Sequence, residues 1–511
     1  MTEEFQIALI FQDGMVLQRD KKISLWGSGP DDEVVTVRIQ NRQARAVVQK
    51  KKWMVILPPL ETSESETLEL SCGNRRIVLQ NIAVGEVWIA GGQSNMEFFV
   101  RYDEEAENIL QRDENRNIRF FDYPELAYPG QREERDYSRY GVWRVCNASH
   151  LEYFSAVGYH FADRLHRDLG VPVGIVGCNW GGTPACAWMD TDYLADNDGK
   201  IWIEEFNNAT AGLDRELYLE KYRSDAGNFR NDIFSDKKGE ALMFGMSRED
   251  QLAFMESPDF SEEINPGPFD KCRPGGLYES MVREVAPYSA RGVLWYQGES
   301  DDKHPEIYRT VLSSLIRCWR DSWNEDLPFL FVQLAPFKEW LKCYGETYPI
   351  LREEQEQVAG HVQDVWMASI MDAGEEWDIH PRKKKPVGER LALLAEGKVY
   401  GRDILCESPV FTDYTLEPGR LTLSFCHAEG GLSIKGESRH ISALELRVHG
   451  AGLANFESRV EGDSVVLTHK SLVPENHVEV SFAGTDYCEV NLFNAAGLPA
   501  RPFSMTAGKR D

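Results

Sequence analysis

The spacing of hydrophobic residues changes twice along the 511-residue chain. In residues 1–81, apolar and polar side chains alternate in short runs, such as Val34-Val35-Thr36-Val37-Arg38-Ile39, and turns containing Gly and Pro separate these runs. Alternation with a period of two is typical of strands that bury one face. We therefore expect residues 1–81 to form a small N-terminal β-sandwich domain.

Residues 82–405 have a different pattern, because near-continuous apolar runs alternate with amphipathic stretches such as 156–169 and 306–320. The apolar runs occupy residues 86–90, 173–178, 291–296, 328–334 and 364–371. Apolar strands that alternate with helices indicate a parallel sheet covered on both faces. Five such strands predict an α/β domain with a flavodoxin-like, doubly wound sheet.

Two further segments complete the expected organisation. Residues near 196–272 have weaker periodicity and many acidic side chains, which indicates a helical insertion in the α/β domain. This insertion either forms a wall of a functional site or is a solvated surface excursion. From residue 406 to residue 511 the alternation returns, as in Leu421-Thr422-Leu423-Ser424-Phe425, and predicts a C-terminal β-sandwich domain.

The amino-acid composition argues against several classes of binding partner. A net charge of −27 argues against nucleic acid and against an anionic membrane surface, and the chain has no 18-residue apolar run that could span a membrane. Met1 to Gln18 lacks a basic segment of the kind that begins a secretory signal, so we expect a cytoplasmic protein. The ten cysteines are scattered without a Cys-x-x-Cys pair, and neither a metal nor an organic cofactor is expected. The sequence does not determine the oligomeric state, and a homo-oligomer is one possibility.

One serine stands where an α/β sheet binds its ligand. Gly91-Gly92-Gln93-Ser94 directly follows the apolar run 86–90, and the glycines permit a sharp turn at the carboxyl end of that strand. A serine hydrolase needs a hydroxyl, a base, a group that orients the base, and donors for the oxyanion. Ser94 is the candidate hydroxyl, although the Gly-x-Ser-x-Gly motif is absent because position 96 is Met.

A candidate base lies near the end of the predicted sheet. His380 follows the run 364–371 in the sequence Asp378-Ile379-His380-Pro381. Asp378 is close enough to orient the imidazole, and Asp372 is a rival orienter. A serine–histidine dyad without an aspartate is a third arrangement, and a loop histidine with a purely structural hydrogen bond is the alternative.

Two more turns at strand ends offer oxyanion donors. One contains Gly181 and Gly182, whose backbone amides can approach a ligand closely, and the other contains Gln297, which has a side-chain amide. Each turn by itself is also an ordinary connection between a strand and a helix. All four loops are expected at one edge of one sheet, and this combination predicts an active site.

These motifs resemble the sialate O-acetylesterase family of the SGNH-hydrolase superfamily. The matching blocks are Gly-Gln-Ser-Asn-Met at 92–96, Trp-Gly-Gly-Thr at 180–183, Trp-Tyr-Gln-Gly-Glu-Ser at 295–300 and Asp-Ile-His-Pro at 378–381. The resemblance extends over nearly the whole chain and implies an SGNH-hydrolase sheet flanked by two β-sandwich domains. It also implies a Ser94 nucleophile, a His380 base, and Gly181, Gly182 and Gln297 in the oxyanion hole. One departure is Trp377, which occupies the place three residues before the histidine where much of the superfamily has the acid.

The resemblance implies a carbohydrate O-acetylesterase that acts on 9-O-acetylated sialic acid through an acetyl-enzyme. Acetylated xylan or another acetylated sugar is an alternative substrate, and a non-catalytic carbohydrate-binding protein is the alternative of another class. Because sialic acid carries a carboxylate, a cation is expected near the pocket. Arg273 and Arg382 are the candidates, and the basic loop at 382–385 is equally consistent with a solvated surface.

Overall fold

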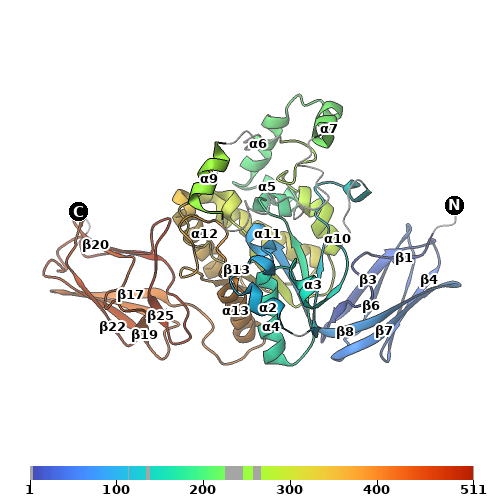
Figure 1. Ribbon diagram of the computed structural model, residues 1–511, viewed down its shortest axis with the longest axis horizontal. Helices are drawn as coiled ribbons and strands as arrows, with labels where there is room; N and C mark the ends of the chain where they lie inside the picture. Colours follow the sequence, from blue (N-terminus) through green and yellow to red (C-terminus); the bar gives the residue numbers. More distant parts are fainter. Residues whose placement is uncertain (1–3, 113, 134–138, 225–245, 257–265, 510–511) are drawn as a thin grey trace. The chain divides into compact units, whose positions relative to one another are not determined.

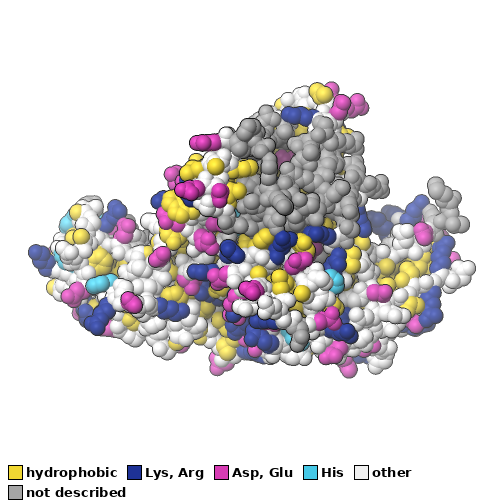
Figure 2. Space-filling view, in the orientation of Figure 1, with side chains coloured by type: hydrophobic (Ala, Val, Ile, Leu, Met, Phe, Trp, Pro, Cys, Tyr) yellow, Lys and Arg dark blue, Asp and Glu magenta, His cyan; other side chains and the backbone are white. Residues whose placement is uncertain are grey.

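A computed structural model describes residues 4–112, 114–133, 139–224, 246–256 and 266–509. The chain forms two compact units. The first comprises Met1–Phe244, Ser261–Ser300 and Thr310–Phe329, and the second comprises Gly245–Phe260, Asp301–Arg309 and Leu330–Asp511. No helix in the described ranges is long and apolar enough to cross a membrane. On the coloured surface in Figure 2, acidic and basic side chains are mixed rather than separated.

The N-terminal part of the first unit consists of two small sheets, as the alternating pattern predicts. The strands β1 (Gln6–Ile7), β3 (Ile23–Ser28) and β6 (Lys52–Leu57) form one antiparallel sheet. In the other, β4 (Val34–Ile39) pairs with β5 (Arg42–Val47) and β7 (Ser63–Cys72), while β7 and β2 (Val16–Gln18) pair with β8 (Arg75–Gly92). Alternate residues of β4 and β6 are buried, including Val35, Val37, Val55 and Leu57, so the period of two places one face of each strand in a shared core.

Strand β8 joins these sheets to the α/β part of the chain (Figure 1). Its 18 residues pair antiparallel with β7 in the first half and parallel with β11 (Val173–Asn179) and β12 (Gly292–Tyr296) in the second half. The expected domain boundary between residues 81 and 82 therefore lies within a continuous strand. Beyond β11, the sheet continues with β9 (Asn115–Asp122) and β10 (Arg144–Cys146), in the order β10-β9-β11-β8-β12.

Helices cover both faces of this sheet. Trp88 of β8 packs against Phe161 of α4 (Ala156–Leu169), with ring centroids 5.1 Å apart. Gly91, three residues further along β8, points to the opposite face, where a Cβ would lie 2.9 Å from the rings of Trp295 and Trp319. Trp319 belongs to α11 (Tyr308–Trp323). The other short helices of this unit are α1 (Ser94–Glu97), α2 (Ala106–Leu110), α3 (Ala148–Leu151) and α10 (Arg283–Val285).

The described part of the predicted insertion near 196–272 contains helices, while its residues 266–272 form turns. The first unit contains α5 (Asp192–Ala195), α6 (Lys200–Thr210) and α7 (Arg215–Ser224), and the second unit contains α9 (Arg248–Met255). Residues 225–245 and 257–265 of the insertion lie outside the described ranges.

The second unit holds the last two predicted apolar strands and the C-terminal sheets. After β13 (Phe329–Val332), the amide of Gln333 donates to the carbonyl of Ala368 at the end of β16 (Val365–Ala368). Near them in the chain are β14 (Glu339–Trp340), β15 (Cys343–Tyr344), α12 (Tyr348–His361) and α13 (Lys384–Leu394).

The C-terminal strands form two four-stranded sheets around one core, as predicted. One sheet has the order β17-β18-β23-β22, the other has the order β21-β20-β24-β26, and β19 pairs with β25. Leu421, Leu423 and Leu467 of the first sheet and Val480 and Phe482 of the second share a buried cluster. The strands are β17 (Val410–Glu417), β18 (Arg420–Cys426), β19 (Leu432–Ile434), β20 (Leu444–Val448), β21 (Ala451–Gly452), β22 (Glu457–Glu461), β23 (Ser464–Thr468), β24 (Val478–Phe482), β25 (Leu492–Asn494) and β26 (Phe503–Ala507).

A buried ion cluster fixes β8 where it enters the parallel sheet. Glu86 is fully buried, and its carboxylate accepts hydrogen bonds from Arg19 at 2.6 Å, Arg291 at 2.8 Å and Gln18 at 3.0 Å. Burial by itself raises the pKa of Glu86, but the hydrogen bond and charge of Arg291, followed by the hydrogen bonds from Arg19 and Gln18, outweigh burial and lower it.

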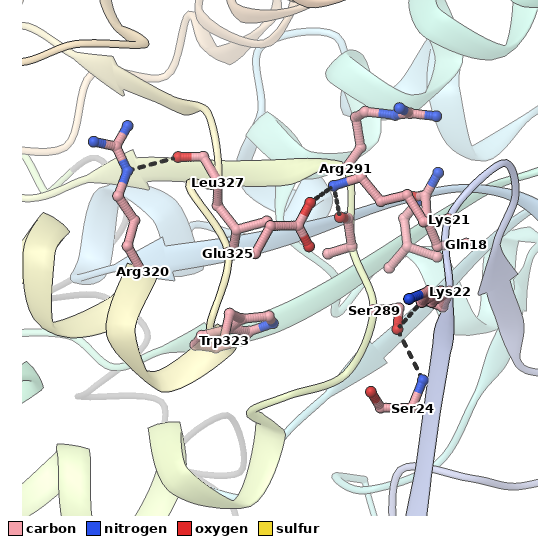
Figure 3. Close-up of polar contacts among 12 residues, drawn as sticks. Gln18, Lys21, Lys22, Ser24, Ser289, Arg291, Arg320, Trp323, Glu325 and Leu327 are labelled. Carbon is pink, nitrogen blue, oxygen red and sulfur yellow. Dashed lines mark hydrogen bonds and ion pairs between the residues drawn. The ribbon is translucent and has the colours of Figure 1, made fainter. Parts of the chain in front are cut away.

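A more exposed set of contacts surrounds this cluster (Figure 3). Lys21 pairs with Glu325 and donates to the carbonyl of Ala290 at 2.9 Å, while the amide of Ser24 donates to the hydroxyl of Ser289 at 3.1 Å. These contacts attach the N-terminal sheets to the loops before β12 and β13.

We expect Arg291→Gln to lower the free energy of unfolding of this unit by about 2–3 kcal/mol at neutral pH, because Glu86 stays buried with one arginine fewer. Since the folded-state pKa of Glu86 is lowered, its contribution is present above the unfolded pKa of about 4.3 and is lost as the pH falls through the folded pKa. The difference between variant and wild type should therefore shrink on acidification. Urea unfolding followed by tryptophan fluorescence at neutral and acidic pH measures it.

Glu325→Gln is the matched control, because Lys21 and Glu325 are 20% and 41% exposed and such pairs contribute at most about 1 kcal/mol. Equal losses in the two variants would contradict a dominant role for the buried cluster.

Candidate active site

Ser94 lies directly after β8, as the first residue of the short helix α1, and is 6% exposed. The strand ends at Gly92, which has a φ of 137°. A Cβ at Gly92 would lie 2.1 Å from the carbonyl oxygen of Tyr296. Only glycine fits this close approach to β12, so the turn that presents Ser94 depends on the absence of a side chain at position 92.

The loop after β11 packs directly against Ser94. A Cβ on Gly181 would lie 3.2 Å from the Cβ of Ser94 and 3.1 Å from the Oε2 atom of Glu97. Gly182 has a φ of +69°, in the left-handed region that favours glycine. The two glycines therefore have different roles, since Gly181 allows the backbone to approach the serine and Gly182 allows the loop to turn.

Two charged side chains hold the peptide groups of Gly181. Its N–H donates to Glu97 Oε2 at 2.7 Å, and its carbonyl accepts from Lys271 Nζ at 2.6 Å. The Lys271 ammonium also lies 5.4 Å from the centroid of the Trp180 ring. In this arrangement the Gly181 amide serves the loop, whereas the Gly182 amide makes no hydrogen bond within the described part of the chain.

The sequence analysis did not identify Glu97 or Lys271. Glu97 could have been found, because it lies three residues after Ser94 and a helical turn brings such residues to the same side. Lys271 gives no signal, since it lies 90 residues from the glycine that it contacts. Burial raises the pKa of Glu97, while the Gly181 amide and the Lys271 charge oppose the rise. Burial and then the Glu97 charge raise the pKa of the neighbouring Asp122 to about 7, against the charge of Arg144.

Gln297 joins the same cluster from the end of β12. Its side chain is fully buried, and Nε2 donates to the carbonyl of Thr183 at 3.2 Å. This bond connects the loop of Gln297 to the loop of Gly181. The structure therefore brings Ser94, Gly181 and Gln297 together within the first unit.

The neighbours of Ser94 also hold the loop that follows Gln297. Gln93 Oε1 accepts hydrogen bonds from the amides of Gly298 at 3.4 Å and Ser300 at 3.3 Å. The Asn95 side chain donates to Glu299 Oε1 at 2.5 Å. Each polar residue beside Ser94 thus fixes a neighbouring loop.

His380 lies in the second unit, in the loop between β16 and α13, and is 3% exposed. Asp378 Oδ1 accepts a hydrogen bond from the backbone amide of His380 at 2.8 Å, while the distance from this oxygen to the imidazole Nδ1 is 3.8 Å. The longer distance exceeds hydrogen-bond range. Asp378 therefore fixes the backbone of His380 rather than its ring, and Trp340 packs edge-on against the ring at 5.0 Å.

The rival aspartate has another partner. Asp372 forms a two-pronged ion pair with Arg390, at 2.6 and 2.8 Å, which ties the end of the β16 region to α13. This geometry favours a structural role for Asp372 over the orientation of His380.

The two arginines expected near a substrate carboxylate lie in different places. Arg273 donates to Glu279 at 3.1 Å in the first unit. Arg382 is exposed in the second unit, where its backbone amide donates to Glu375 at 3.0 Å.

Comparison with known proteins now gives the class. The family described as "Carbohydrate esterase, sialic acid-specific acetylesterase" matches residues 265–393, which include Gln297 and His380. A carbohydrate acetylesterase from Xanthomonas citri of known structure is 26% identical, with a TM-score of 0.75 over 98% of this chain and 99% of that chain. The protein is therefore a carboxylic-ester hydrolase, and both similarities are to carbohydrate esterases.

Within that class, the chain is related to the sialate O-acetylesterases. The enzyme of Mus musculus is 26% identical over 439 residues, which cover 78% of this chain and 74% of the relative. The enzyme of Homo sapiens is 24% identical over 448 residues, covering 80% and 73%. These relatives confirm the resemblance drawn from the sequence motifs.

We expect the imidazole of His380 to stay neutral from about pH 8 down to about pH 5, because burial and then the charge of Lys384 lower its pKa to about 3. In the unfolded chain the same ring should titrate near about 6.5, so this site loses stability as the pH falls below that value. NMR of ¹³C-histidine-labelled protein, with the His380 signal assigned by its loss in His380→Gln, measures the titration. A folded-state midpoint near the unfolded value would contradict the expectation.

Proposed function

We propose that the protein removes O-acetyl groups from acetylated sugars, with 9-O-acetylated sialic acid as its substrate, through a serine nucleophile in an SGNH-type, doubly wound sheet. The observation that carries the proposal is the position of Ser94, at the end of β8 and against the Gly181 loop, with Gln297 tied to that loop. The names of the related enzymes support the choice of sugar. We also propose the division into an N-terminal β domain at 1–81, a catalytic domain at 82–405 and a C-terminal β domain at 406–511.

The proposed reaction has two steps. Ser94 Oγ attacks the acetyl carbonyl while His380 accepts its proton, and the sugar leaves with that proton as an acetyl-enzyme forms. His380 then takes a proton from water as the oxygen of that water attacks the acetyl group, and His380 returns the proton to Ser94 Oγ as acetate leaves. A neutral imidazole is the form that can accept a proton, and the lowered pKa of His380 keeps the ring in that form at neutral pH while making it a weaker base.

Hydrogen-bond donors would stabilise the oxyanion of both steps. We propose the Ser94 amide, the Gly182 amide and the side chain of Gln297 as these donors. The Gly181 amide can join them only if Glu97 releases it. In this proposal Asp378 acts through the backbone of His380, so the site works as a dyad whose histidine loop is fixed by an aspartate.

Ser94→Ala should abolish the release of acetate from a chromogenic acetyl ester and from acetylated sugars, with an unchanged thermal midpoint, because the variant keeps the backbone of the turn. A fluorophosphonate probe should label Ser94, as mass spectrometry of the digested protein can show. Ser289→Ala, at the contact with the N-terminal sheets, is the control that should retain activity and labelling. Labelling of another residue, or near-normal turnover by Ser94→Ala, would exclude this serine. Absence of any esterase activity in the wild type would favour a binding protein.

His380→Ala should lower kcat by roughly 10³–10⁴-fold, as expected when the residue that transfers protons is lost. Asp378→Asn should lose far less, because the amide oxygen of Asn can still accept the hydrogen bond from the His380 backbone. Steady-state kinetics of both variants with the same acetyl ester tests this difference. Equal losses would point to a strict triad, and a larger loss in Asp372→Asn would show that Asp372 is the orienter.

A further inference from the structure

A partly enclosed cavity of about 250 Å³ lies in the first unit, beside the loop that packs on Ser94. Its lining includes Asp122 and Asn179, at the carboxyl ends of β9 and β11, together with Arg139 and Arg144. Ligands of open α/β sheets bind at this edge. Glu97 lines the cavity as well, and the same carboxyl group accepts the hydrogen bond from the Gly181 amide. The cavity and the Ser94 loop therefore share a wall.

The two arginines of the cavity are held differently. Arg144 begins β10, and its backbone pairs with Phe120 of β9, so its position is fixed by the sheet. Its charge acts on Asp122, whose pKa it lowers against the effect of burial. The guanidinium of Arg139 lies 3.9 Å from the centroid of the Tyr153 ring, which also lines the cavity. Of the two, Arg144 has the more rigid backbone and lies beside the buried acid.

The lining suits an acidic, polyhydroxylated ligand. Planar carboxyl, amide and guanidinium groups together with the Tyr153 ring provide partners for hydroxyl groups and for a sugar face. Arginine binds a carboxylate with two parallel hydrogen bonds. Three carboxyl groups line the cavity, those of Glu97, Asp122 and Glu125. Asp122 is largely protonated below about pH 7 and burial raises the pKa of Glu97, so these two oppose an anionic ligand less than ionised groups would.

We propose that this cavity is the subsite for the carboxylate and neighbouring hydroxyl groups of the substrate sugar, and that Arg144 binds the carboxylate. The inference depends on the proposed function, because it assigns how that site selects an acidic sugar. It gives Arg144 the role that the sequence alone assigned to Arg273 or Arg382. Glu97 belongs both to the sugar subsite and to the surroundings of the nucleophile. It lines the cavity, and its carboxyl group accepts the hydrogen bond from Gly181, in the loop that packs on Ser94.

The test compares Arg144→Gln with the wild type on three acetyl esters. These are 9-O-acetylated sialic acid, its C1 carboxamide, which lacks the negative charge, and 4-nitrophenyl acetate. Loss of a charged hydrogen-bond partner should lower kcat/KM for the acid by roughly 10–100-fold. The carboxamide and 4-nitrophenyl acetate should be cleaved at the wild-type rate, so the variant should lose its preference for the acid over the carboxamide.

Arg101→Gln is the matched control. Arg101 lies 5.1 Å from the centroid of the same Tyr153 ring but does not line the cavity. This variant should keep the preference for the acid, and thermal midpoints of all three proteins establish that they are folded.

Three results would overturn the inference, and they separate it from the proposed function. If Arg144→Gln cleaves the acid as well as the wild type does, the carboxylate binds elsewhere. If it loses activity equally on all three substrates, Arg144 is structural. Both results leave the proposed esterase function of the wild type standing. If the wild type cleaves 4-nitrophenyl acetate but not acetylated sialic acid, the proposed sugar is wrong, and the assignment of Arg144 fails with it.

Discussion

The close contact between the backbones of Gly92 and Tyr296 is the constraint on which the site depends. A Cβ at Gly92 would lie 2.1 Å from the Tyr296 carbonyl, so β8 and β12 can stay paired to their ends only with glycine there. Because β8 is also the strand that carries the N-terminal sheets, one element fixes both the scaffold and the turn that holds Ser94. Glu86 secures the same strand at its entry to the parallel sheet, where three side chains satisfy its buried carboxylate.

The polar residues around Ser94 all make hydrogen bonds to neighbouring loops. Gln93 holds the amides of residues 298 and 300, Asn95 holds Glu299, and Glu97 holds the amide of Gly181. Each bond ties the helix that begins at Ser94 to a loop from a neighbouring strand. Such bonds restrict the movement of the loops relative to the serine, and a fixed geometry is what donors to a developing oxyanion require. The block 92–97 is therefore a positioning element as well as the carrier of a hydroxyl group.

The sequence predicts most of the fold, because strands that are apolar throughout and strands with alternating burial leave clear patterns. It misses β9 and β10, since β9 begins with Asn115-Arg116-Asn117 and β10 has only three residues. Motif spacing also predicts which loops carry Ser94, Gly181, Gln297 and His380 as candidate site residues. It does not reveal which contacts these residues make. The Trp377 departure hints that Asp378 is displaced, but only coordinates show that its carboxylate binds the backbone amide of His380 instead of the ring. Contacts such as that of Lys271 depend on the tertiary fold and have no local signal.

In the proposed reaction, which develops negative charge beside Ser94, two buried carboxyl groups would oppose catalysis if both were ionised. Burial is the largest cause of the raised pKa of both Glu97 and Asp122, and the charge of Glu97 raises that of Asp122 further. Asp122, with a pKa of about 7, can keep a proton near neutral pH, which would limit the negative charge near the oxyanion of the proposed reaction. Lys271 adds a positive charge at the Gly181 carbonyl and lowers the pKa of Glu97. Because these opposing effects act on the protonation of Glu97, its side chain must offer an acceptor to the Gly181 amide in either protonation state. A carboxyl group meets this condition, because one oxygen can accept the N–H while the other carries the proton.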